Sequence, residues 1–161
     1  MRSLSPVEAA ALISLGGCVL AVVVPTFARN VHASYVSEAT RGVSDLAMRA
    51  AARLEAAGTP HALPESAPLT PAHVPRGVRV TDPPGTWSHP TWRALEFGFE
   101  QPHFYSFAFD AERTELEAKF RARAHGDLDG DSVQSSVSID GSFRPGAGVT
   151  LSPLDVQNEI E

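Results

Sequence analysis

The chain has 161 residues, of which 43% are hydrophobic, and its formal net charge at pH 7 is −6. This length accommodates one modest domain beside a long helix. The negative charge gives no support to nucleic-acid binding, which usually requires a basic surface patch. Cys18 is the only cysteine, so no disulfide can form within the chain.

The N-terminal stretch is almost wholly apolar. Residues 9–28 carry no charge, and about 20 apolar residues allow a helix to cross the hydrocarbon core of a bilayer. Ser5 and Pro6 suit a helix start, and Gly58 suits a helix stop. Apolar residues continue at helical spacing as Val36, Ala39, Val43, Leu46, Ala47, Ala50 and Leu54. We therefore expect a helix over residues 4–57, with a transmembrane half at residues 9–28 and an amphipathic second half.

Glu8 separates three interpretations of this stretch. A cleaved secretory signal would end near Val31 and Ala33, but the helical pattern continues through that point. An ordinary single-span anchor leaves Glu8 unexplained, because a carboxylate inside a bilayer costs about 3 kcal/mol and usually serves a function. The third interpretation accounts for Glu8 and rests on a resemblance.

Glu8, Pro25 seventeen positions later, the apolar run between them and the amphipathic continuation to about Ala57 resemble the N-terminal helix of type IV pilins and pseudopilins. The resemblance implies that a leader of residues 1–3 is cut after Ser3 and that Leu4, the new amino terminus, is methylated. It implies that Glu8 faces a neighbouring subunit's amino terminus and that Pro25 loosens or kinks the helix. Ser3 stands where the family normally has Gly.

The resemblance also implies partners and a location. The expected partners are other pilin subunits, the prepilin peptidase, the pilus assembly machinery and the lipid bilayer. The expected location is the inner membrane, as a single-pass protein, before assembly, and a cell-surface or periplasmic filament afterwards. Gly16 and Gly17 would allow neighbouring helices to approach closely in such an assembly.

Residues 58–161 are expected to form a globular head. Eight prolines between Pro60 and Pro90 favour a long surface loop over residues 59–90, with a flexible linker as the alternative. Apolar and polar residues then alternate over 95–100, 105–110, 116–124 and 136–140, which predicts an antiparallel sheet within residues 92–140 and a tail at 141–161. The expected fold is α+β: the long helix packs on a small four-stranded antiparallel sheet.

Three carboxylates lie in the turn HGDLDGDS. Asp127, Asp129 and Asp131 could bind Ca²⁺, which prefers six to eight oxygen ligands. Ser132 and Ser138, however, stand where an EF-hand has its turn Gly and its bidentate Glu. Asp and Gly also suit turns, so a purely structural turn is the alternative. The turn resembles those in the heads of some deltaproteobacterial pilins.

No nucleophile motif, phosphate-binding loop or metal signature of histidine and acidic residues occurs, so we expect a protein without catalytic activity and, calcium apart, without a cofactor. Trp87 and Trp92 are expected to cover the sheet edge. Two functions stay open: a filament subunit, and a monomeric membrane-anchored binding or adhesion domain that could bind calcium. The scattered histidines are expected to be solvated loop residues: His61, His73, His89, His103 and His125.

Overall fold

The computed structural model describes residues 6–158, and the chain divides into two compact units, Met1–Ser34 and Tyr35–Glu161. Helix α1 (Pro6–Ala57) contributes to both units. The other elements belong to the second unit: η1 (Pro60–Ala62), β1 (Ala67–Thr70), α2 (Pro90–Ala94), β2 (Tyr105–Arg113), β3 (Ala118–Gly126), β4 (Ser135–Arg144), β5 (Gly148–Leu151) and β6 (Asp155–Gln157).

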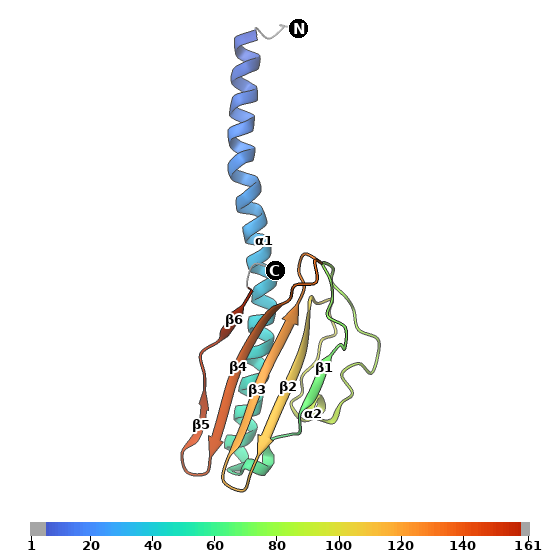
Figure 1. Ribbon diagram of the computed structural model, residues 1–161, viewed down its shortest axis with the longest axis vertical. Helices are drawn as coiled ribbons and strands as arrows, with labels where there is room; N and C mark the ends of the chain where they lie inside the picture. The colour runs from blue at the N-terminus through green and yellow to red at the C-terminus, as the bar shows by residue number, and fades with distance from the viewer. Residues whose placement is uncertain (1–5, 159–161) are drawn as a thin grey trace. The chain divides into compact units, whose positions relative to one another are not determined.

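The second unit is built on one antiparallel sheet of six strands (Figure 1). The strand order is β1-β2-β3-β4-β5, and β6 pairs with β4. The long central strands are in continuous register, for example with Asp110 opposite Arg121 and Arg121 opposite Asp140. The two last strands share one edge of β4, because β6 pairs with residues 136–138 and β5 with residues 141–144.

The expected fold, a long N-terminal helix on a four-stranded sheet, is wrong. The sheet has six strands, and the helical segment that packs against it is the short one at residues 36–57. Strands β1, β5 and β6 have only four, four and three residues. Such short strands carry too few residues for an alternating pattern to identify them.

The expected membrane location is also wrong. Within residues 6–158, the structure contains no helix with enough length and apolar character to cross a bilayer. This finding overturns both the transmembrane half at residues 9–28 and the single-pass inner-membrane location.

The segment 95–100 alternates like a strand but is not one. His89 accepts a hydrogen bond from the Thr91 backbone at 3.3 Å, and Pro90 occupies the first turn of α2. The chain then leaves α2 through Glu96, whose φ of 51° is incompatible with an extended strand. Leu95 and Phe97 are nevertheless buried. The alternation here therefore correctly indicates which side chains are buried, although the segment is not a strand.

The core lies between α1 and one face of the sheet. Gly42 allows a close approach, because a Cβ at this position would lie 2.5 Å from Cε1 of Phe107. The helix contributes Ala39, Val43, Leu46, Ala47, Ala50 and Leu54, all fully buried, and the sheet contributes Phe107, Phe109, Phe120, Ala122, Ala124 and Val137. Burial of this apolar surface is the main stabilising term of the second unit.

Candidate functional site

The residues expected to guide assembly lie in the N-terminal part of the chain. Ser3 and Leu4 fall outside the described residues, and so do the side chains of Glu8, Gly16 and Pro25. Gly17 is exposed, with no atom within 4 Å of the position of an added Cβ. The assembly roles of all these residues stay predictions.

The Asp127–Asp131 turn brings its three carboxylates together, with one oxygen from each within 4.8 Å of the others. Each carboxylate accepts hydrogen bonds from the backbone of the turn itself. Asp127 is 1% exposed and accepts from the N–H groups of Gly130 at 2.8 Å and Ser132 at 3.1 Å. Asp129 accepts from the Asp131 N–H at 3.1 Å, and Asp131 accepts from the Val133 N–H at 2.7 Å.

These contacts favour the structural interpretation of the turn. An Asp carboxylate that accepts hydrogen bonds from backbone N–H groups two to five residues later stabilises a local turn. This is the usual reason why Asp is common in turns. The turn also holds a second segment, because Gly77 donates to the carbonyl of Asp127 at 2.7 Å and Arg76 Nε lies 3.8 Å from its carboxylate. Calcium binding by Asp127, Asp129 and Asp131 stays a prediction.

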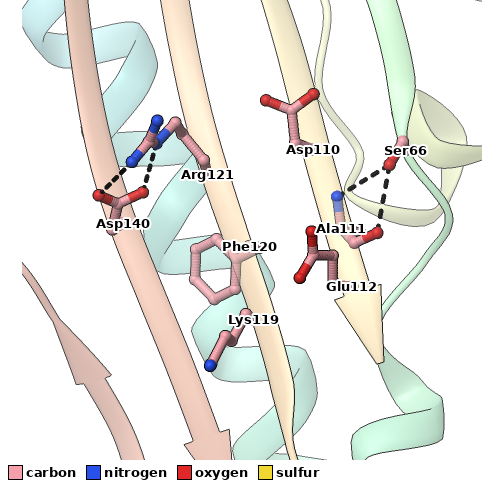
Figure 2. Close-up of a pocket in the computed structure, with 8 residues that line it drawn as sticks. All are labelled: Ser66, Asp110, Ala111, Glu112, Lys119, Phe120, Arg121 and Asp140. Atoms are coloured by element: carbon pink, nitrogen blue, oxygen red, sulfur yellow. Dashed lines mark hydrogen bonds and ion pairs between the residues drawn. The ribbon is translucent and has the colours of Figure 1, made fainter. Parts of the chain in front are cut away.

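A hollow of about 540 Å³ lies on the face of the sheet that α1 does not cover (Figure 2). Its charged residues come from the neighbouring strands β2, β3 and β4, and two of them, Arg121 and Asp140, pair with each other. Arg121 binds Asp140 through two hydrogen bonds, of which the Nη2–Oδ2 bond measures 2.9 Å. The lining consists of Ser66, Asp110, Ala111, Glu112, Lys119, Phe120, Arg121 and Asp140.

Charge pairing continues along this outer face. Arg123 Nη2 lies 2.8 Å from Asp110, and Lys119 Nζ lies 3.3 Å from Glu117. The hydrogen bonds from Arg121 lower the pKa of Asp140, and Asp140 in turn raises the pKa of Arg121. The cations of β3 therefore already have acidic partners on the neighbouring strands and turns.

The one hydroxyl that lines the hollow is engaged with the backbone. Ser66 Oγ accepts from the Ala111 N–H at 2.9 Å and donates to the Ala111 carbonyl at 3.3 Å (Figure 2). It thereby continues the hydrogen bonding of the β2 edge beyond the short strand β1. A nucleophile would need a neighbouring base instead of this backbone partner. The hollow thus has the chemistry of a paired polar surface.

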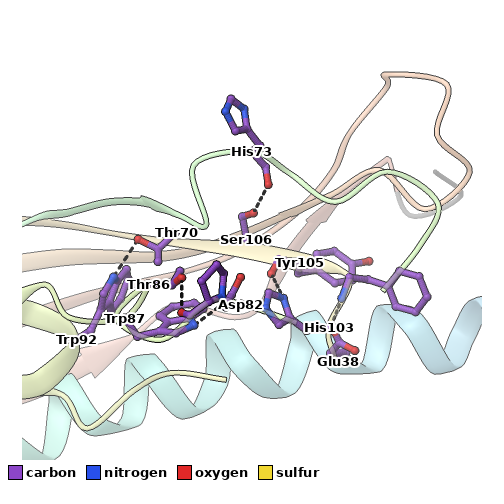
Figure 3. A network of polar contacts seen from close by, with 12 residues as sticks. Glu38, Thr70, His73, Asp82, Thr86, Trp87, Trp92, His103, Tyr105 and Ser106 are labelled. Carbon is purple, nitrogen blue, oxygen red and sulfur yellow. Dashed lines mark hydrogen bonds and ion pairs between the residues drawn. The ribbon is translucent and has the colours of Figure 1, made fainter. Parts of the chain in front are cut away.

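The expectation that the histidines are solvated is wrong for His103, which is 1% exposed. His103 lies in a polar network with Asp82 and Trp87 (Figure 3). Its Nε2 lies 2.9 Å from Asp82 Oδ2, and its Nδ1 lies 2.8 Å from the Tyr105 carbonyl. Trp87 donates to the same Asp82 oxygen at 2.7 Å. Asp82 and His103 are 21 positions apart, and no sequence pattern connects them.

The other histidines differ in their surroundings. His61 is exposed and lies 3.1 Å from Glu115. His125 lies on β3, where partial burial and then the charge of Arg123 lower its pKa. Burial also raises the pKa of Tyr105, against a smaller lowering by its hydrogen bond with Ser135.

Comparisons of the chain with protein-family models, curated proteins and solved structures give no match.

Proposed function

We propose that the protein is a structural subunit of a type IV pilin-like or pseudopilin-like filament, in which copies associate through the N-terminal part of α1. The observation that carries this proposal is the exposed apolar surface of that helix. Val7 is 78% exposed, Val19 52% and Val23 54%. Large exposed apolar surfaces mark sites of association.

The composition of this surface supports the proposal. The side chains described between residues 6 and 23 are all exposed, and none is charged: Pro6, Val7, Ser14, Gly17, Cys18, Val19, Ala21, Val22 and Val23. Burial of a valine side chain contributes about 1.5 kcal/mol. The same helix of another copy, with its own small and apolar residues, would cover this surface by close packing around Gly17.

The second unit provides a contrast. The large hydrophobic residues exposed there occur singly on different elements, as with Val78 in a loop and Leu116 in the β2–β3 turn. Its outer sheet face carries paired charges. The apolar contact that association requires is therefore available on α1, and Glu8 adds the polar contact that sets the register between subunits.

The test is to replace the chain in its producing cells with variants and to collect filaments by differential centrifugation, with immunogold electron microscopy. We expect the wild-type chain in filaments. Glu8→Ala and Val19→Asp should abolish incorporation at unchanged protein levels, because the first removes the register contact and the second places a charge in the helix contact.

Val78→Asp is the matched control, since Val78 is 62% exposed in the second unit and lies outside α1. It should enter filaments at the wild-type level. Absence of filaments in the wild type, or normal incorporation of both α1 variants, would overturn the proposal. A monodisperse wild-type chain would instead favour a monomeric binding domain.

A further inference from the structure

The aromatic residues of the second unit are buried, with two exceptions. Among the side chains described within residues 36–158, only those of Trp87 and Phe99 are aromatic and partly exposed. Their ring centroids lie 5.7 Å apart, and their planes are tilted by 48°. Both residues line a hollow of about 500 Å³, the Trp87 hollow, which Pro83, Pro84 and Glu100 also line. The exposed aromatic surface of this unit is therefore gathered at one concave place.

The Trp87 ring is held in one orientation. Its Nε1–H donates to Asp82 Oδ2 at 2.7 Å (Figure 3). The Asp82 side chain is 6% exposed, and the same oxygen lies 2.9 Å from Nε2 of His103. The Trp92 ring lies edge-on, with its centroid 5.5 Å away, and a Cβ added at Gly98 would lie 3.1 Å from Cγ of Trp87. The aromatic wall of the hollow is therefore preorganised, and a ligand does not have to order it.

Glu100 gives the Trp87 hollow an available negative charge. Its side chain is exposed, and no other described residue forms an ion pair or hydrogen bond with its carboxylate. No lysine or arginine among the described residues lines this hollow. A smaller hollow of about 360 Å³ shares Trp87, Phe99 and Glu100, but Arg93 also lines it. The larger hollow thus combines aromatic surface with a carboxylate and lacks a cation of its own.

We propose that the Trp87 hollow binds a small organic cation with an alkylated ammonium group. A cation is attracted to the face of an aromatic ring, most strongly to that of Trp, and Glu100 supplies the opposite charge. The alkyl groups of such a cation gain from contact with the two rings and with Pro83 and Pro84. A primary ammonium group is strongly hydrated and would lose this hydration against the same apolar surface. The proposal is independent of filament assembly, because all these residues lie in the second unit.

The test is an NMR titration of the full chain with choline, in which the indole N–H signal of Trp87 is followed and the amides of β4 serve as internal reference. We expect the Trp87 signal to shift with a dissociation constant of about 1 mM, the scale that two rings and one carboxylate supply. The neutral compound 3,3-dimethylbutan-1-ol has the shape of choline without its charge. It should bind about tenfold more weakly, because the attraction to the rings and to Glu100 requires the positive charge.

Glu100→Gln is the decisive variant, because it keeps the size of the side chain and removes its charge. We expect it to weaken choline binding by about tenfold and to leave binding of the neutral compound unchanged. Glu112→Gln is the matched control, since Glu112 is also exposed but lines the hollow of the outer sheet face. It should bind choline like the wild type. Absence of a Trp87 shift at about 50 mM choline, far above the expected dissociation constant, would overturn the proposal. Equal affinity for choline and the neutral compound, or unchanged choline affinity in Glu100→Gln, would also overturn it.

Discussion

The two faces of the sheet are made by alternate residues of the same strands, yet they are held by different forces. On β3, Phe120, Ala122 and Ala124 are 4%, 0% and 0% exposed and contribute to the core with α1. The alternate residues Lys119 and Arg121 are exposed and point to the outer face. Successive side chains of a strand point to opposite faces, so one period-two sequence produces both surfaces.

The difference between the faces is one of magnitude. Complete burial of a large apolar side chain contributes about 1.5–3 kcal/mol, whereas an exposed ion pair contributes about 0–1 kcal/mol. The pair Arg121–Asp140 is 54% and 52% exposed. Stability should therefore depend on the inner face, and the outer face should tolerate change.

The largest effect should come from uncovering the inner face. A chain that begins at Gly58 lacks the helical segment that buries Phe107 and Phe109, and exposed aromatic surface drives association. We expect a chain beginning at Tyr35 to melt cooperatively and the chain beginning at Gly58 to aggregate or to show no transition. Circular dichroism melts with light scattering measure both. Equal behaviour of the two chains would contradict the importance of the helix.

A single core residue should have the next largest effect. The Phe120 ring stacks on Phe109, with centroids 5.6 Å apart, and lies directly over Gly141. We expect Phe120→Ala to lower the free energy of unfolding by about 3–5 kcal/mol. Its neighbour on the outer face provides the control: Lys119→Ala should change the value by about 0.5 kcal/mol or less. Urea denaturation separates the two results, and similar losses would refute the contrast between the faces.

A buried polar group should have an intermediate effect. Asp127 is 1% exposed and accepts two backbone hydrogen bonds, so Asp127→Ala leaves donors unsatisfied and should cost about 1–3 kcal/mol. Asp129 is exposed, so Asp129→Ala should lower the free energy of unfolding by less than Asp127→Ala does. If the turn is purely structural, millimolar Ca²⁺ leaves the melting temperature unchanged. A rise in the wild type that Asp129→Ala abolishes would establish the calcium interpretation.

The smallest effect should come from the outer face. Arg121→Gln removes the hydrogen bonds that lower the pKa of Asp140, so this pKa should return toward its ordinary value of 3.8. The pKa of Asp140 is lower in the folded state than in the unfolded state. The pair therefore stabilises the fold fully at pH values above the unfolded-state pKa, and this stabilisation is lost as the pH falls through the folded-state pKa. We expect a loss below about 1 kcal/mol near neutral pH and none in strong acid. NMR titration of Asp140 measures the shift, and an unchanged titration curve would contradict the assigned cause.

The longest strands and the packed helix segment could be recognised from sequence. Alternation over 105–110, 116–124 and 136–140 overlaps β2, β3 and β4, with residues 116 and 117 in the turn before β3. The apolar residues that repeat at helical spacing from Val36 to Leu54 lie in or against the core. These elements extend over several periods of their own pattern. The periodic alternation of apolar and polar residues can be read over a short stretch of sequence, so it predicts these elements without knowledge of the fold.

The tertiary structure decided the rest. β1, β5 and β6 exist because the long strands supply backbone partners for three or four residues each, a contribution that no local pattern records. The alternating segment 95–100 is an irregular stretch after the short helix α2, and its aromatic residues pack in or against the core. Asp82 and His103 meet only because residues 78–88 return to the start of β2. Contacts between distant residues depend on how the chain folds back on itself. The local sequence around a residue does not record which distant residue will contact it.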